Sequence, residues 1–255
     1  MNQPSGSDGS LASAYIVLRR AIGIIGISLP FVLLIGKILI EGHGMPDSIS
    51  ACYYTVMRNV LVGSLCSIGV FLLCYRYKNH DFVFTVLAGV FTVGVALFPM
   101  APKVCPTPAE RIIGQVHYLS AALFFLTLAV ISLFRFTKTN PENTRRPSKL
   151  LDYFSLLWVT KTIPGKPLGR RKKWRNRIYR ICGYTIVVCV FLLKLVMRPS
   201  IETQFEHIHP VFWLETIAVV AFGVSWLIKG ETLWRDPKSD LAASAPIKSQ
   251  VNSGN

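Results

Sequence analysis

The run Gly169-Arg-Arg-Lys-Lys-Trp-Arg-Asn-Arg177 is the densest cluster of positive charge in the chain, and it decides how the apolar segments on either side are oriented. Lys and Arg collect on the cytoplasmic flanks of membrane helices, because a dense basic block is not readily carried across the bilayer. We therefore place this run in the cytoplasm. The orientation of every other apolar segment then follows by alternation along the chain.

The composition is that of a multi-span membrane protein. Apolar residues make up 51% of the chain and charged residues 16%, against about 25% charged residues in soluble domains. The net charge of +15 raises the question of nucleic-acid binding. A nucleic-acid binder carries its basic residues on one folded face, whereas here they lie between apolar segments. We therefore expect no nucleic-acid partner and attribute the charge to positive-inside topology and to attraction for anionic lipid.

Alternation from the basic run predicts six membrane spans, with both termini in the cytoplasm. The expected fold is an all-α polytopic membrane helix bundle over residues 21–230, in a bacterial inner membrane or a plasma membrane. Residues 1–20 and 231–255 are expected to be disordered tails. Gly23 and Gly26 predict a close approach by a neighbouring helix. The predicted spans cover about residues 21–40, 59–75, 82–98, 112–134, 178–197 and 211–228.

The cytoplasmic connection over residues 135–177 carries thirteen Lys or Arg residues against two acids, Glu142 and Asp152. Apolar residues at helical spacing over 150–158 predict a short helix, either on the inner membrane surface or packed under the bundle. We expect the connection to contact anionic lipid headgroups. The side chains expected to make this contact are Arg170, Arg171, Lys172, Lys173, Arg175 and Arg177.

Polar residues within spans are candidates for function, because a charge at mid-span costs about 2.5 to 3.5 kcal/mol on insertion scales. The alternation places these residues toward the outer leaflet, below loops that carry further polar groups. We predict an outward-facing cavity that binds a lipid or a small polar ligand, with a cation holding an anionic group. The candidate ligand-binding residues are Arg58, His117, Lys194, Glu215, Asp47, Tyr53 and Tyr54.

Two other function classes remain open alongside a non-enzymatic binding protein. A metal-dependent intramembrane hydrolase would hold zinc through His117, His207 and His209 and activate a water; otherwise no cofactor is expected. A proton- or ion-coupled carrier would use Glu215 and His117 as titrating groups. A structural alternative also exists, in which Glu215 pairs with Arg58 or Lys194 and only locks helices together, or is protonated in an apolar site.

The cysteines divide between spans and loops. Cys52 and Cys105 both fall in exterior loops, so an oxidising exterior would allow a disulfide between them. Within the spans a thiol behaves as a small apolar side chain. The span cysteines are Cys66, Cys74, Cys182 and Cys189.

The stretch Ser48-Ile-Ser-Ala-Cys-Tyr-Tyr-Thr-Val-Met-Arg-Asn-Val-Leu-Val-Gly63 resembles a group of bacterial multi-pass membrane proteins in which a Ser-Ile-Ser-x-Tyr-Tyr-Tyr-Thr segment leads into the second span. Cys52 stands where that group has tyrosine. Gly94-Val-Ala-Leu-Phe-Pro99 and Phe222-Gly-Val-Ser-Trp-Leu-Ile-Lys-Gly230 look like further marks of the group. More distantly, the arrangement is similar to the DUF998 and Frag1/DRAM/Sfk1 families, which implies six helices and lipid handling. The alkaline ceramidase-like zinc hydrolases offer a further comparison, although they have seven spans.

Overall fold

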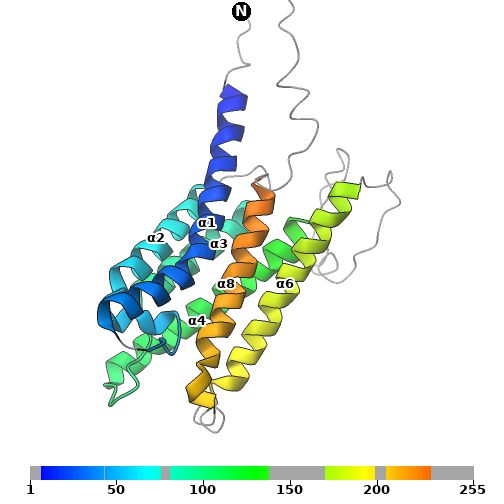
Figure 1. The fold of residues 1–255 in the computed structure, drawn as a ribbon. Helices are drawn as coiled ribbons and strands as arrows, with labels where there is room; N and C mark the ends of the chain where they lie inside the picture. Colours follow the sequence, from blue (N-terminus) through cyan, green and yellow to red (C-terminus); the bar gives the residue numbers. More distant parts are fainter. Residues whose placement is uncertain (1–6, 43, 76–80, 138–169, 199–204, 231–255) are drawn as a thin grey trace, which may run out of the picture.

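The computed structural model describes residues 7–42, 44–75, 81–137, 170–198 and 205–230, and these residues form helices and connecting loops with no strand (Figure 1). Helix α4 continues into a π-helical turn, Ile131–Arg135, and two short 3₁₀ helices are η1 (Ser50–Tyr54) and η3 (Glu206–Ile208). The long helices are α1 (Ser7–Glu41), α2 (Arg58–Cys74), α3 (Asp81–Leu97), α4 (Pro108–Val130), α6 (Arg170–Val196) and α8 (Pro210–Lys229).

Four of these helices are long and apolar enough to cross a membrane: Ser13–Glu41, Pro108–Arg135, Lys172–Val196 and Pro210–Lys229. Helix α2 and the segment Phe82–Leu97 of α3 are also apolar but shorter. The predicted all-α class and the helical bundle are confirmed, and the membrane-length helices indicate a membrane protein. The predicted tail 231–255 and the predicted surface helix at 150–158 lie outside the described residues.

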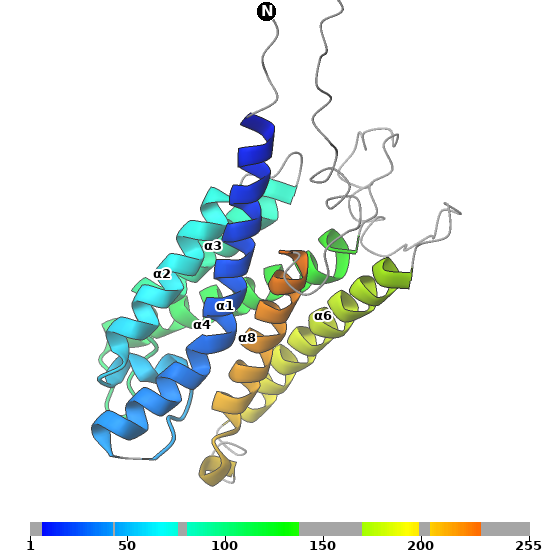
Figure 2. The same ribbon diagram turned by 45° about the horizontal axis from the view of Figure 1, so that its top comes forward.

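Each long helix packs chiefly against two others, and together they form a closed ring in the order α1, α2, α3, α4, α6, α8 and back to α1. Figures 1 and 2 show α1 lying between α2 and α8. The ring closes between the first and last helices that the structure describes. In the first half of α1, the guanidinium of Arg19 donates to the carbonyl oxygen of Lys229 at 3.2 Å, and that of Arg20 donates to the carbonyl oxygen of Gly230 at 3.3 Å.

Glycines bring the neighbouring helices of this ring into backbone contact. A Cβ built on Gly223 of α8 would lie 2.8 Å from the carbonyl oxygen of Gly23 in α1. A Cβ on Gly89 of α3 would lie 3.0 Å from the carbonyl oxygen of Gly69 in α2. A Cβ at either position would force the neighbouring backbone to shift, so glycine is what permits this close spacing. The close approach predicted at Gly23 is confirmed.

Two helices begin well before the spans that the sequence predicts. Helix α1 starts at Ser7, so the prediction of a disordered tail is wrong for residues 7–20. Leu and Ala favour helix in this stretch. Helix α6 starts at Arg170, so residues 170–177 belong to a helix rather than to a connection. Arg and Lys are good helix formers, and this run contains no Gly or Pro after position 169.

The two ends of the bundle differ in charge. The basic end is where α1 and α6 begin and α8 ends, and its described cations include Arg19, Arg135, Arg175 and Lys229. At the opposite end, here called the acidic end, cations such as Lys37 share the surface with acids. Every acidic residue whose side chain is described lies at this end: Glu41, Asp47, Glu110 and Glu215.

Candidate functional site

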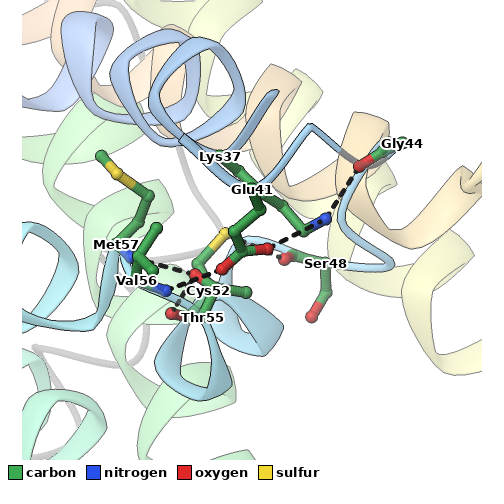
Figure 3. Close-up of polar contacts among 8 residues, drawn as sticks. All are labelled: Lys37, Glu41, Gly44, Ser48, Cys52, Thr55, Val56 and Met57. Atoms are coloured by element: carbon green, nitrogen blue, oxygen red, sulfur yellow. Dashed lines mark hydrogen bonds and ion pairs between the residues drawn. The ribbon is translucent and has the colours of Figure 1, made fainter. Parts of the chain in front are cut away.

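The segment between α1 and α2 is tied to the last turn of α1 (Figure 3). The ammonium of Lys37 lies 3.4 Å from a carboxylate oxygen of Glu41 and donates to the carbonyl oxygen of Gly44 at 2.9 Å. The other Glu41 oxygen accepts a hydrogen bond from the backbone N–H of Val56 at 2.8 Å. Both ends of the segment are therefore fixed to the same helix, which holds η1 against the ring.

Within this segment, η1 presents two polar side chains to the same side. The hydroxyl of Ser48 accepts a hydrogen bond from the backbone N–H of Ala51 at 2.8 Å and so begins the turn. In a 3₁₀ helix, side chains three residues apart eclipse one another. Ser50 and Tyr53 are three residues apart, and both line the same cavity in the middle of the helix ring.

Glu215, in the first turns of α8, holds η1 in place from the other side. Its carboxylate accepts a hydrogen bond from the backbone N–H of Ile49 at 2.6 Å and also bonds the backbone N–H of Ser50. The backbone N–H of Phe212 donates to the carbonyl oxygen of Asp47 at 3.1 Å. Two segments that are far apart in sequence are therefore joined by Glu215, which bonds to backbone amides rather than to Arg58 or Lys194.

His117 of α4 completes the polar cluster and is only 3% exposed. Its Nδ1 lies 2.7 Å from the carbonyl oxygen of Phe98, and its Nε2 lies 3.0 Å from the hydroxyl of Ser50. A carbonyl oxygen can only accept, so in the neutral ring Nδ1 carries the proton. Nε2 then has a free lone pair and accepts the hydrogen of the Ser50 hydroxyl.

A cavity of about 60 Å³, here called the apolar chamber, lies next to this cluster on the side of the ring interior. It is several times larger than the roughly 10 to 15 Å³ that one buried water requires. Its polar lining consists of Ser50, Tyr53, His117 and Glu215. Most of its wall is aliphatic or aromatic and includes Leu29, Leu61, Leu65, Val95, Phe124 and Val219.

A second cavity of about 280 Å³, here called the charged pocket, adjoins the apolar chamber at the acidic end. Asp47 lies on its wall with Lys103 Nζ 2.9 Å and His209 Nδ1 3.3 Å from its two carboxylate oxygens. Ser50 and Glu215 line both cavities, so they form the boundary between them. The other polar residues of this wall include Ser48 and Tyr118.

The structure brings together some of the predicted site residues and separates others. His117, Glu215 and Tyr53 line the apolar chamber, and Asp47 lines the charged pocket. The exposed Arg58 contacts the site through Tyr53, because its guanidinium donates to the Tyr53 hydroxyl at 2.5 Å and lies 4.2 Å from the ring centroid. The other two predicted residues line neither cavity: the Tyr54 hydroxyl donates to the carbonyl oxygen of Met100 at 2.6 Å, and Lys194 is exposed on α6.

The three histidines considered for zinc do not assemble. His207 is exposed, and both ring nitrogens of His117 bond to protein atoms. His209 has a left-handed backbone conformation just before α8. In the part of the chain that the structure describes, no three His, Cys, Asp or Glu side chains are grouped so that they could hold a metal ion.

The two loop cysteines are both free thiols, Cys52 buried and Cys105 exposed. The disulfide that an oxidising exterior would allow between them is not formed in this structure. Burial raises the pKa of the Cys52 thiol to about 12, and the neighbouring carboxylate of Glu215 adds to this effect.

Sequence reasoning missed Ser50 and Lys103, which lie in loops where hydrophobic periodicity carries no signal. The spacing of Ser50 and Tyr53 could have indicated a shared face, but only if the 3₁₀ turn had been known. It also missed a polar contact at the basic end. There Arg19, only 9% exposed, donates to the hydroxyl of Tyr75, whose ring packs edge-on against Trp226 at 5.4 Å.

These features define an all-α helical bundle with membrane-length apolar helices and a polar cluster between two cavities at one end. No family model, curated protein or solved structure matches the chain. The resemblance carried by the Ser48–Gly63 stretch stays a prediction.

Proposed function

We propose that this protein spans the membrane six times and binds a lipid or lipid-like amphiphile from the outer side. Helices α2 and α3 have 17 residues each, which corresponds to about 25 Å against a hydrocarbon core of about 30 Å. Local thinning of the bilayer accommodates a mismatch of this size at modest cost. With the basic end in the cytoplasm, both termini lie in the cytoplasm and the cavities face the outer leaflet of a bacterial inner membrane or a plasma membrane.

The observation that carries this proposal is the pair of adjoining cavities of opposite character. The apolar chamber offers an aliphatic wall, and each methylene group transferred into such a wall from water contributes about 0.8 kcal/mol. The charged pocket offers Lys103, Asp47 and His209 to a polar head. Ser50 and Glu215 lie where the acyl chain of a bound amphiphile would join its polar head.

At the basic end we propose contact with anionic lipid of the cytoplasmic leaflet. Lys172, Lys173 and Arg177 are exposed in the first turns of α6. The Arg177 guanidinium also lies 5.7 Å from the ring centroid of Trp174, a residue type that favours the membrane interface. The side chains of Arg170 and Arg171 lie outside the described residues, and Arg175 is half-buried beside Tyr179.

Binding can be tested with two matched substitutions on neighbouring positions of α4. Ala121 lines the apolar chamber, whereas Ala122 is exposed on the outside of the bundle. Ala121→Phe fills the chamber, so we expect affinity for a fluorescent fatty acid or lysolipid to fall at least tenfold in detergent-purified protein. Ala122→Phe adds the same bulk outside the chamber and should leave affinity unchanged.

Equal affinity in the wild type and both variants would refute binding in the apolar chamber. The carrier alternative is tested with the same protein in vesicles, where it requires ligand flux coupled to a proton gradient. The zinc alternative requires stoichiometric metal in the purified protein that is lost on His117→Ala.

A further inference from the structure

We propose that Ser50 and His117 are a nucleophile and its general base, and that they cleave the ester bond of an acyl-chain amphiphile held across the two cavities. This inference rests on the proposed binding function. It adds a reaction, two catalytic residues and the class of substrate, which is a carboxylic ester with one long chain.

The geometry of the pair is that of an activated hydroxyl. The 3.0 Å separation of Ser50 Oγ and His117 Nε2 is within hydrogen-bond reach, as a nucleophile and its base require. The third group of such an arrangement orients the imidazole, and the carbonyl oxygen of Phe98 at 2.7 Å from Nδ1 does so here. This carbonyl fixes the proton on Nδ1, which leaves Nε2 ready to accept the proton of the serine.

The position of Ser50 matches an ester linkage. Ser50 lies on the boundary of both cavities, with the aliphatic wall on one side and Asp47 and Lys103 on the other. An acyl chain lying in the apolar chamber with its alcohol portion in the charged pocket would place the carbonyl carbon at this boundary. The charged pocket would also admit the water needed for the second half of the reaction.

The oxyanion formed during attack needs a donor, and the backbone amides near Ser50 are already used. The N–H of Ile49 bonds to Glu215, and the N–H of Ala51 bonds to the hydroxyl of Ser48. Tyr53 lies one 3₁₀ turn from Ser50, lines the chamber and accepts a hydrogen bond from Arg58. We assign the hydroxyl hydrogen of Tyr53 to the oxyanion, and the Arg58 guanidinium bonded to the Tyr53 oxygen favours that donation.

The reaction balances with water as the only co-reactant. Ser50 Oγ bonds to the carbonyl carbon while its proton passes to His117 Nε2, which gives a tetrahedral oxyanion. The bond from carbon to the alcohol oxygen breaks, and Nε2 protonates the leaving alcohol. Water then attacks the acyl-serine and loses a proton to Nε2. The bond to Ser50 Oγ breaks, Oγ regains that proton, and a fatty acid leaves.

A fluorophosphonate probe tests the nucleophile directly, because an activated serine oxygen displaces fluoride from phosphorus and retains the tag. We expect the purified full chain to be labelled on the peptide that contains Ser50 and to hydrolyse p-nitrophenyl esters of medium-chain acids. Ser50→Ala should abolish the label. Ser67→Ala is the control, because the Ser67 hydroxyl donates to the carbonyl oxygen of Gly63 in its own helix and lines neither cavity.

Two further variants separate a chemical role from a structural one. His117→Gln should lower kcat by about 100- to 10,000-fold, the usual contribution of a general base. Tyr53→Phe should lower kcat by about 100- to 1,000-fold with little change in KM, because one oxyanion donor is lost. Each variant is scored only if it binds the fluorescent fatty acid as the wild type does, which shows that the cavities are intact.

The possible outcomes distinguish a failure of the catalytic inference from a failure of the proposed binding function. In one outcome, fatty-acid binding is sensitive to Ala121→Phe, but Ser50 is not labelled and no ester is hydrolysed. This result would overturn the catalytic role and leave the binding function standing. Loss of chamber-specific binding itself would overturn the proposed function. Labelling or hydrolysis that persists in Ser50→Ala would assign the activity elsewhere and also refute the inference.

Discussion

Substituting Gly223 with alanine tests the backbone contact that closes the helix ring. The added Cβ would lie 2.8 Å from the carbonyl oxygen of Gly23 and 3.0 Å from the backbone nitrogen of Ile27, neither of which can rotate away. Helices α1 and α8 must therefore move apart or strain, and overpacking of this kind costs about 1 to 3 kcal/mol.

A second glycine provides the control for intrinsic helix preference. Gly63 lies on the exposed face of α2, and a Cβ there would meet nothing within 4 Å. Replacing glycine with alanine inside a helix contributes up to about 1 kcal/mol at either position. This contribution cancels when the two variants are compared, so Gly223→Ala should be less stable than Gly63→Ala by about 1 to 3 kcal/mol, the overpacking cost alone.

The comparison is made by unfolding each variant with sodium dodecyl sulfate in mixed micelles and following tryptophan fluorescence. Trp226 is buried in the same core as Phe222, next to the substituted position, so its emission reports opening of this helix pair. If the two variants unfold at the same denaturant fraction, or if Gly223→Ala is the more stable, the glycine contact does not set the helix spacing and the reasoning fails.

Three further predictions concern the loops and the helix ends. At pH 8 a maleimide should modify the exposed Cys105 rapidly and Cys52 hardly at all, because a pKa of about 12 leaves about one thiol in 10,000 ionised; equal rates, measured by peptide mass spectrometry, would show that Cys52 is not buried. Thr107→Ala should cost about 0.5 to 2 kcal/mol in the unfolding assay, because the Thr107 hydroxyl accepts from the Glu110 N–H at 3.3 Å in a capping box at the start of α4; Thr107→Ser should retain most of that stability. Arg19→Ala should cost at least about 1.5 kcal/mol, because it removes the charged hydrogen bonds that Arg19 donates to the Tyr75 hydroxyl and to the carbonyl oxygen of Lys229. An unchanged midpoint would refute the contact.

The helices were largely predictable because each apolar run is bounded by Pro, Gly or charge. Pro108 and Pro210 each stand in the first turn of a helix, where a missing N–H costs nothing. The start of α1 was not predictable from hydrophobicity, because residues 7–20 continue the helix as a mixed sequence without an apolar run. Hydropathy indicates which residues of a segment are apolar enough to lie in lipid. It does not indicate where the backbone hydrogen bonding of the helix begins or ends.

The end of the bundle at which the site residues lie was predictable, but the direction of their side chains was not. Alternation placed both His117 and Lys194 near the same end, and both lie in the half of their helix that is nearer the acidic end. It could not tell that His117 points into the ring while Lys194 is exposed on α6, because the face of a helix depends on its neighbours. The contribution of Ser50 to the site could not be predicted for a related reason. It depends on a loop conformation fixed by Glu215, which lies 165 residues later in the chain.

The contact between the first and last helices has a consequence for how the chain is made. Helix α1 and the η1 segment are synthesised long before α8, so Gly23 and the backbone N–H groups of Ile49 and Ser50 have no α8 partner until α8 has been made. Both partners, Gly223 and Glu215, lie on α8 and are therefore synthesised together. A nascent chain cut short before α8 would therefore lack both the helix contact that closes the ring and the carboxylate that holds η1 in place.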